Sequence, residues 1–230
     1  MPDKIQLFCL PHAGTSAFFY YAWNKRLKEK FELFPLELAG RGGRAGEDYH
    51  KDFEAAVDDA YKRLVRDIKG NYILLGHCMG GLLVYELAVR LYENDIKGPE
   101  HIIFSGQVPP DIREGLLFLG NADDHVLIEQ IKKMGGNEEE PLIDDDLKDF
   151  FLPILRADCR MFDQYEMKKK IKLLCDITVL YGDKDLHNDG QNMKLWEHFT
   201  NGKCDLHELK GDHYFINYSS DKIIDILLAL

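Results

Sequence analysis

The most constraining feature of the sequence is a cysteine-centred motif, Gly76-His77-Cys78-Met79-Gly80-Gly81. An apolar run typical of a buried strand, residues 72–75, precedes it, and a segment with one apolar face, residues 82–91, follows it. Strand, sharp turn and helix is the context in which a G-x-nucleophile-x-G pattern has a mechanism. Glycines on either side of Cys78 let strand and helix approach closely while the cysteine takes a strained backbone conformation. The motif therefore predicts a thiol presented at the end of a sheet, beside the backbone N–H of Met79.

Composition limits the classes of protein to which the chain can belong. With 230 residues, 45% of them hydrophobic and 30% charged, we expect one folded domain over residues 1–230. No apolar run approaches the roughly 20 residues that span a bilayer, and the first residues do not have the pattern of a secretory signal. The net charge of −11 disfavours a nucleic-acid binder. We therefore expect a monomer that contacts neither membrane nor nucleic acid.

The cysteines and histidines favour a cytoplasmic protein without a metal. The five cysteines are an odd number and include no C-x-x-C pair, which argues for reduced thiols and against a structural zinc site. No H-E-x-x-H pattern or other three-ligand spacing is present, so we expect no catalytic metal.

Predicted strands alternate with predicted helices along most of the chain. This alternation indicates an α/β fold in which helices cover both faces of a mostly parallel sheet. Residues 204–209 alternate apolar and polar side chains, which suits a strand at the edge of the sheet. The predicted strands are residues 4–10, 31–38, 72–75, 101–105, 177–181 and 204–209, and the predicted helices are residues 17–30, 52–69, 80–93, 190–200 and 220–228.

One region, residues 108–167, interrupts this alternation with helix signals and no strand. Its predicted helices are residues 124–134, 145–155 and 157–169. An insertion of about sixty residues between two core strands suggests a lid over an active site. The alternative is a packed helical subdomain that never moves.

A cysteine nucleophile needs a base, and the base needs an orienting acid. In enzymes with this motif the acid and the histidine follow the nucleophile in chain order. The turn Gly182-Asp183-Lys184-Asp185 follows a late strand and supplies the acid, for which we choose Asp185 and keep Asp183 as the alternative. The loop after the last strand supplies His213.

The second oxyanion donor should come from the loop after the first strand. Pro11-His12-Ala13-Gly14 fits, because its small residues let the backbone approach a substrate. We assign the donor to the N–H of Ala13, acting with that of Met79. His12 and His77 flank these groups and are expected to pack or form hydrogen bonds, without a direct catalytic role.

Five motifs spread over nearly the whole chain resemble one family, the type II thioesterases that accompany nonribosomal peptide and polyketide synthases. The resemblance implies an α/β-hydrolase fold with a helical lid. It also implies removal of acyl groups from the phosphopantetheine arm of carrier proteins, with no cofactor beyond that arm. It maps nucleophile, acid and base onto Cys78, Asp185 and His213. It suggests that Arg156 and Asp158 tie the lid to the core, with contact to the substrate as the alternative. The motifs are Leu10-Pro11-His12-Ala13-Gly14, Gly40-Arg41-Gly42-Gly43-Arg44, Gly76-His77-Cys78-Met79-Gly80-Gly81, Leu155-Arg156-Ala157-Asp158, and Gly182-Asp183-Lys184-Asp185 with Gly211-Asp212-His213-Tyr214-Phe215.

The main departure from the family pattern is Cys78, which stands where a serine is usual. Attack by its thiol exchanges one thioester for another, so the acyl-enzyme is itself a reactive thioester. Two activities follow: hydrolysis, in which His213 activates water, and acyl transfer to an amine, thiol or hydroxyl acceptor. A cysteine engineered in place of serine to trap an acyl-enzyme is a third interpretation. A binding module that keeps the motif without turnover is the non-enzymatic alternative.

Docking of an acidic carrier protein needs a local basic patch, because the overall charge of −11 is repulsive. The candidate in the sequence is Arg160 with Lys168-Lys169-Lys170, at the end of the predicted lid. The alternative for this group is a solvated helix end.

Overall fold

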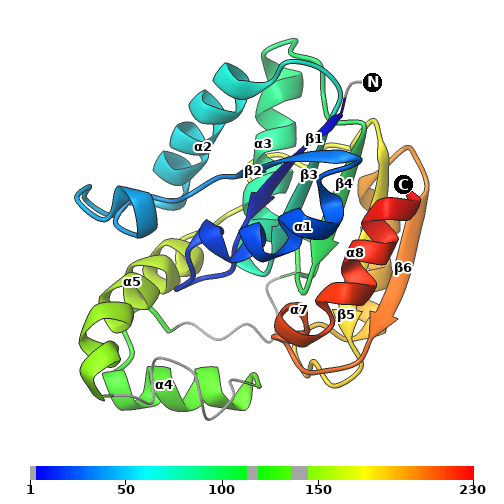
Figure 1. Ribbon diagram of the computed structural model, residues 1–230. Helices are drawn as coiled ribbons and strands as arrows, with labels where there is room; N and C mark the ends of the chain where they lie inside the picture. Colours follow the sequence, from blue (N-terminus) through cyan, green and yellow to red (C-terminus); the bar gives the residue numbers. More distant parts are fainter. Residues whose placement is uncertain (1–3, 113–118, 136–144) are drawn as a thin grey trace.

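The core of the protein is a six-stranded parallel sheet, seen in a computed structural model that describes residues 4–112, 119–135 and 145–230 (Figure 1). Across the sheet the strand order is β2-β1-β3-β4-β5-β6, and every neighbouring pair of strands is parallel. The prediction of a mostly parallel sheet flanked by helices is confirmed. The strands are β1 (Ile5–Leu10), β2 (Phe31–Pro35), β3 (Tyr72–His77), β4 (His101–Ser105), β5 (Asp176–Gly182) and β6 (Cys204–Leu209).

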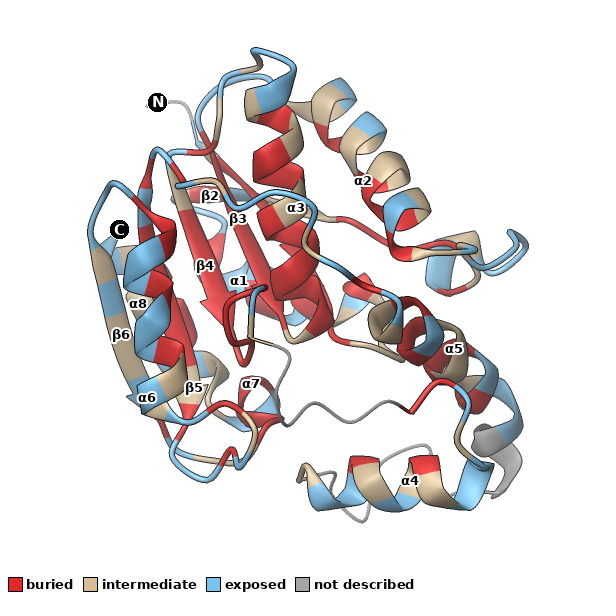
Figure 2. Cartoon of the chain, turned by 180° about the vertical axis from the view of Figure 1, so that it is seen from behind, coloured by how far each residue is buried: buried red, intermediate tan, exposed pale blue. Residues whose placement is uncertain are grey.

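The strands differ in burial according to their place in the sheet. All six residues of β3, which lies between β1 and β4, are buried, as the apolar run before the cysteine motif predicts. β6 lies at the edge and exposes Asp205 and Glu208, which confirms the predicted edge strand. Figure 2 shows this difference between the buried middle of the sheet and its β6 edge. The cysteine motif therefore follows the most completely buried strand of the sheet.

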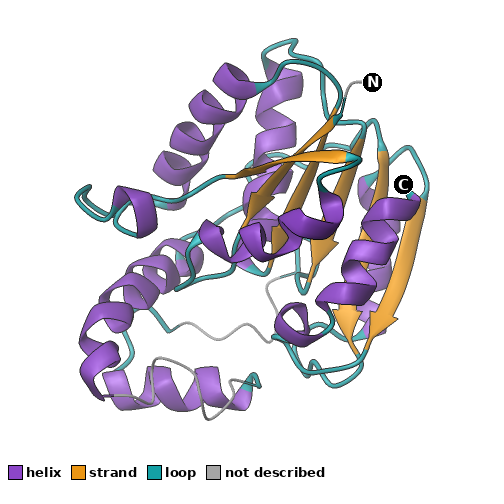
Figure 3. Cartoon of the chain, in the orientation of Figure 1, coloured by secondary structure: helices purple, strands orange, loops and turns teal. Residues whose placement is uncertain are grey.

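Helices cover both faces of the sheet (Figure 3). Because successive strand side chains point to opposite faces, Leu74 packs with α2 and α3, while Ile73 and Leu75 pack with η1, α1, α7 and α8. Within the described residues, no helix combines the length and the apolar character that crossing a membrane requires. The helices are η1 (Ala17–Trp23), α1 (Asn24–Leu27), η2 (Gly42–Arg44), α2 (Phe53–Asp67), α3 (Met79–Glu93), α4 (Asp124–Lys133), α5 (Asp145–Asp163), α6 (Gly190–Lys194), η3 (Leu195–Phe199), α7 (Phe215–Tyr218) and α8 (Ser220–Ala229).

The chain between β4 and β5, called the insertion below, carries α4 and α5 beyond the carboxyl ends of the strands (Figure 1). A small apolar cluster joins the two helices to each other and to Tyr214 of the sheet-end loops. Its buried members are Leu119, Leu127, Ile131, Leu152, Leu155, Cys159 and Tyr214.

Several predicted helices have different bounds in the structure. Residues 17–30 form the 3₁₀ helix η1 and the short α1. The predicted helices 145–155 and 157–169 are one helix, α5, which passes through Pro153 and ends at Asp163. A proline inside a helix removes a hydrogen bond, but Leu152, Leu155 and Cys159 are buried at helical spacing on both sides of it. Burial of this continuous apolar face keeps the segment helical.

Candidate active site

Cys78 lies at the sharp turn between β3 and α3, as the motif predicts. Its φ of 52° and ψ of −122° lie outside the regions that non-glycine residues prefer. The turn is crowded: a Cβ on Gly76 would lie 2.1 Å from the carbonyl oxygen of Gly80, and a Cβ on Gly80 would lie 2.3 Å from that of Leu10. Both positions therefore require glycine, and the close packing that they allow holds the strained cysteine in place.

Asp185 and His213 are brought together from the loops after β5 and β6. The Nδ1 atom of His213 donates a hydrogen bond to the carboxylate of Asp185 at 2.8 Å, and both side chains are buried. Asp185 also accepts hydrogen bonds from the N–H of His187 (3.0 Å) and from the side-chain amide of Asn188 (3.0 Å). Burial alone would raise the pKa of Asp185, but these donors outweigh it and keep that pKa below its usual value. The alternative acid, Asp183, is exposed and instead accepts a hydrogen bond from the N–H of Gly211 (2.8 Å).

His213 faces Cys78 across a shared cavity. Within the described residues, its Nε2 atom is buried and has no hydrogen-bond partner. Burial disfavours the charged imidazole, but the negative charge of the Cys78 thiolate and the hydrogen bond to Asp185 outweigh it and raise the pKa of His213 to about 10. The arrangement therefore places a ring that is able to hold a proton on the same cavity as the thiol of Cys78.

The two predicted oxyanion donors line the same cavity as Cys78. Met79 begins α3, where first-turn N–H groups have no partner inside the helix. The N–H of Gly14 donates to Asp158 (2.8 Å) and that of Thr15 to the carbonyl oxygen of His12 (3.3 Å). In the described part of the chain, the N–H of Ala13 has no acceptor. The backbone N–H groups of Ala13 and Met79 are thus available to a substrate oxygen.

Two cavities meet at this site. The first has a volume of about 740 Å³ including its open part, and its lining is mostly apolar. The second, of about 770 Å³, is more polar and is lined by Thr15, Ser16 and Asn217 among others. His12, Ala13, Ile131, Leu155 and Tyr214 line both cavities. The apolar cavity lies beside the thiol, and the polar cavity lies across the residues that line both. This arrangement suits a ligand with one apolar and one polar end.

A buried ion pair joins three of the sequence motifs. Arg41, from the loop that leads into η2, makes two hydrogen bonds to Asp158 of α5, one of them 2.5 Å long, and both side chains are almost fully buried. Asp158 also accepts the N–H of Gly14, next to Ala13. Asp158 therefore ties the insertion to the core, as the sequence suggests. Arg156 does not: it donates to the carbonyl oxygen of Ala122 (2.6 Å) and pairs with Asp124 (2.5 Å), inside the insertion.

His12 and His77 are buried neutral rings packed around the site. His12 bonds through Nε2 to the hydroxyl of Thr15 (2.6 Å), and His77 bonds through Nδ1 to that of Ser105 (2.9 Å). Burial, reinforced by the nearby His213, lowers the pKa of His12 to about 3 and that of His77 well below its usual value. Both rings therefore remain uncharged beside Cys78 and His213.

Sequence reasoning missed Asn188. Its side-chain amide lies 3.0 Å from Asp185 and 3.2 Å from Nδ1 of His213, and it lines the apolar cavity. The sequence contained a sign of this contact, because the side chain of an asparagine three residues after an aspartate can form a hydrogen bond to that aspartate in a turn.

The basic patch expected at Arg160 and Lys168–Lys170 is neutralised in the structure. Lys168 pairs with Glu54 (2.5 Å), Lys169 with Glu93 (3.2 Å) and Lys170 with Asp111 (2.6 Å). Arg160 donates to the carbonyl oxygen of Gly120 (3.0 Å). The sequence interval between these lysines and their acidic partners is 59 residues or more, so no local pattern could reveal the pairing. The group is therefore not a free cationic surface.

Comparison with known proteins identifies the family. The model of the thioesterase domain matches residues 5–230, so the chain belongs to the thioesterase family. It is 27% identical to the gramicidin S biosynthesis protein GrsT of Aneurinibacillus migulanus, over 97% of this chain and 88% of that protein.

Solved structures agree with this assignment. ClbQ from the colibactin NRPS/PKS pathway superposes with a TM-score of 0.92 and 31% identity, over 98% of this chain and 95% of that one. The type II thioesterase BorB from the borrelidin biosynthetic cluster gives a TM-score of 0.90 and 28% identity, over 100% and 93%. The predicted α/β-hydrolase fold and thioesterase family are confirmed.

Proposed function

We propose that the protein is a type II thioesterase that hydrolyses acyl groups from the phosphopantetheine arms of carrier proteins, with Cys78 as nucleophile. The observation that carries the proposal is the strained cysteine at the β3–α3 turn, facing His213 and its hydrogen bond to Asp185 across an apolar cavity. The similarity to GrsT, a gramicidin S biosynthesis protein, and to ClbQ, from an NRPS/PKS pathway, supports a role in such a pathway. We also propose that the protein acts as a cytoplasmic monomer with one domain over residues 1–230.

The first half-reaction forms the acyl-enzyme. The thiolate of Cys78 attacks the thioester carbonyl carbon, and the resulting oxyanion accepts hydrogen bonds from the N–H groups of Ala13 and Met79. The bond between carbonyl carbon and pantetheine sulfur then breaks, and the imidazolium of His213 gives its proton to the departing sulfur. Asp185 holds the ring in orientation and favours its charged form throughout.

The second half-reaction releases the acid. Neutral His213 takes a proton from a water molecule at Nε2, and the oxygen of that water attacks the acyl-Cys78 thioester. The carbon–sulfur bond breaks, the carboxylic acid leaves, and the thiolate–imidazolium pair is restored. We further propose that the insertion, residues 108–167, serves as a lid that supplies the apolar lining for the acyl chain and limits access of water.

The test is hydrolysis of an octanoyl-loaded carrier protein, followed by mass spectrometry of the small products and of the intact protein. Octanoic acid as the main product supports the proposal. Amide or exchanged thioester formed in preference to the acid, when amines or thiols are added, would assign the protein to acyl transfer. A Cys78→Ser variant that hydrolyses much faster than the protein itself would indicate that the cysteine was introduced as an acyl-enzyme trap.

Alkylation of Cys78 distinguishes an active enzyme from a binding module without turnover. We expect iodoacetamide at neutral pH to modify Cys78 before Cys204, because burial raises the pKa of Cys204 to about 11, whereas Cys78 lines a cavity together with His213, which can take the proton of the thiol. Peptide mass spectrometry reads the order of labelling. Equal, slow labelling of both cysteines would favour an inert module.

A further inference from the structure

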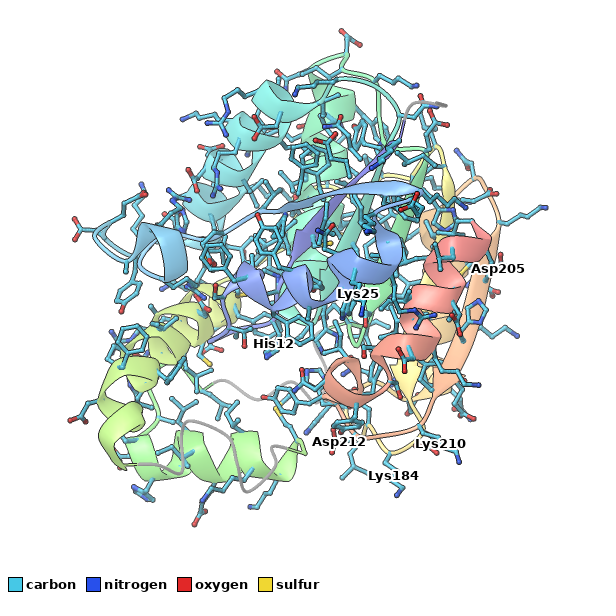
Figure 4. All side chains as sticks on the ribbon, in the orientation of Figure 1. His12, Lys25, Lys184, Asp205, Lys210 and Asp212 are labelled. Carbon is cyan, nitrogen blue, oxygen red and sulfur yellow. The ribbon has the colours of Figure 1, made fainter. Side chains whose placement is uncertain are left out.

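Four exposed lysines lie on three segments near the carboxyl ends of the strands. Lys132 and Lys133 end α4, Lys184 lies in the loop after β5, and Lys210 lies in the loop after β6. Backbone hydrogen bonds join the three segments that carry them. They run from the N–H of His213 to the carbonyl oxygen of Met134 (3.1 Å) and from the N–H of Lys184 to that of Gly211 (2.9 Å). Figure 4 shows Lys184 and Lys210 at one corner of the molecule, together with Asp212. We call Lys132, Lys133, Lys184 and Lys210 the lysine rim.

The lysine rim is a group of exposed cations without an ion-pair partner among the described residues of an acidic protein. All four side chains belong to exposed residues, and none of them pairs with an acid among the described residues. Asp183 and Asp212, in the same loops, are engaged by the N–H groups of Gly211 and Tyr214 at 2.8 and 2.9 Å. The rim therefore differs from Lys168–Lys170, each of which has an acidic partner.

The rim also borders the outer residues of both cavities. Leu186, two residues after Lys184, is 84% exposed, and the next residue, His187, lines the apolar cavity. On the other side, the carbonyl oxygen of Lys210 accepts a hydrogen bond from the hydroxyl of Ser219 (3.0 Å), just after α7, whose Asn217 lines the polar cavity. A macromolecule that approached the cavities past His187 or Asn217 would therefore meet these cations and an exposed leucine.

We propose that the lysine rim, together with Leu186, is the docking surface for an acidic carrier-protein domain. The inference rests on the proposed function. Local cations offset the repulsion between an acidic carrier and a protein of net charge −11, and they steer the encounter toward the mouth of the site. The exposed Leu186, two residues after Lys184, supplies an apolar contact beside these cations, a combination common in recognition surfaces.

Charge reversal tests the docking surface. The variant pair Lys184→Glu with Lys210→Glu should raise the KM for an octanoyl-loaded acidic acyl carrier protein about three- to tenfold and leave kcat unchanged. Lys132→Glu with Lys133→Glu is an independent variant pair that should act in the same direction. The matched control is Lys25→Glu with Lys28→Glu, two exposed lysines, one in α1 and one at its C-cap, that carry the same charge change away from the site (Figure 4 labels Lys25).

Small substrates separate carrier docking from phosphate binding. Octanoyl-pantetheine and octanoyl-phosphopantetheine should keep their KM values in the rim variants. An equal rise with octanoyl-phosphopantetheine would show a phosphate site and overturn the proposal. An equal rise in the Lys25/Lys28 control would also overturn it, since overall charge would then explain the effect.

Calorimetry with the holo carrier protein measures docking without turnover. In the rim variants, the Kd for the holo carrier protein should rise by the same factor as the KM for the octanoyl-loaded carrier protein. Unchanged carrier binding in both rim variants would overturn the docking surface while hydrolysis of octanoyl-pantetheine still supported the proposed function. If the protein hydrolysed no thioester, the proposed function would be wrong. The binding measurement would still show whether the lysine rim binds the carrier protein.

Discussion

The two walls of the apolar cavity are built in different ways. The sheet wall consists of Cys78, Met79, Asn188 and His213, from turns at the ends of parallel strands. The insertion wall consists of residues from α4, α5 and the segment before α4, such as Leu119, Ile131, Leu155 and Cys159. Polar, chemically reactive groups concentrate on the sheet wall, and apolar surface concentrates on the insertion wall.

The two walls also differ in what fixes them. The sheet wall is held by hydrogen bonds within short turns and between adjacent strand ends, such as the N–H of Cys78 to the carbonyl oxygen of Ser105 (2.8 Å). The insertion wall reaches the core through contacts between residues far apart in sequence, above all Asp158 with Arg41 and Gly14. Changes in the sheet wall should therefore affect the chemical step, and changes in the insertion wall should affect stability and the choice of acyl chain.

The largest expected effect is the loss of the nucleophile. Cys78→Ala should lower kcat/KM for octanoyl-pantetheine by about 10⁴-fold or more, because the covalent route disappears. His213→Ala should cost a similar factor, and the double variant should be no worse than either single one. Hydrolysis is measured as free octanoic acid per unit time.

Cys159→Ala is the matched control for the nucleophile, since this thiol lines the same cavity from the insertion wall. Burial raises the pKa of Cys159 far above its usual value, so it stays a protonated packing group. We expect it to keep activity within a few-fold. If Cys159→Ala lost as much activity as Cys78→Ala, the separation of the two walls would be wrong.

The next largest effect concerns the anchor of the insertion. Asp158→Asn should lower the free energy of unfolding by about 3–5 kcal/mol, because it leaves the charge of Arg41 buried without its partner. Urea denaturation followed by circular dichroism measures the change. Replacing both partners with apolar residues, as in Arg41→Met with Asp158→Leu, should recover part of the loss.

Asp221→Asn is the control for the anchor, because the pair of Asp221 with Arg26 is exposed. That variant should change the free energy of unfolding by about 1 kcal/mol or less. Equal effects of Asp158→Asn and Asp221→Asn would contradict the role of the buried pair in holding the insertion.

The third effect is on protonation in the sheet wall. The pKa of His213, raised to about 10, depends on the negative charge of the Cys78 thiolate and on Asp185. Cys78→Ala removes the thiolate, so burial weighs more and the pKa of His213 should fall. NMR titration of the ring between pH 5 and 11 reads the shift directly. An unchanged titration in Cys78→Ala would mean that sulfur and imidazole do not form a pair.

The two walls also differ in how far the sequence could reveal them. Cys78, Asp185 and His213 follow strands that are evident as apolar runs, and parallel strands bring their carboxyl ends to one edge. The sequence therefore predicted which side chains would meet at this edge, although their catalytic roles stay predictions. It did not predict that α5 passes through Pro153 or that Asp158 pairs with Arg41, 117 residues away. Burial in the tertiary structure keeps α5 helical through Pro153, and long-range packing brings Asp158 to Arg41. Neither feature has a local sequence pattern.

The smallest expected effect concerns acyl-chain choice, which we assign to the insertion wall. Leu155 lines both cavities and packs against Gly14, where an added Cβ would lie 3.1 Å from the leucine side chain. Leu155→Trp should narrow the apolar chamber and lower the ratio of kcat/KM for octanoyl-pantetheine to that for acetyl-pantetheine by about tenfold. The short acyl group should be little affected, because the sheet wall that carries out the chemistry is unaltered.

The control for Leu155→Trp is Phe150→Trp on the same helix, since Phe150 is 57% exposed and lines neither cavity. It should leave the octanoyl-to-acetyl ratio unchanged. If Leu155→Trp instead lowered kcat/KM equally for both chain lengths, the substitution would be acting through Gly14 and the neighbouring N–H of Ala13. Gly14 and Ala13 belong to the loop after β1. That result would mean that the insertion helps to position the oxyanion donor of Ala13, and the two walls would then not act separately.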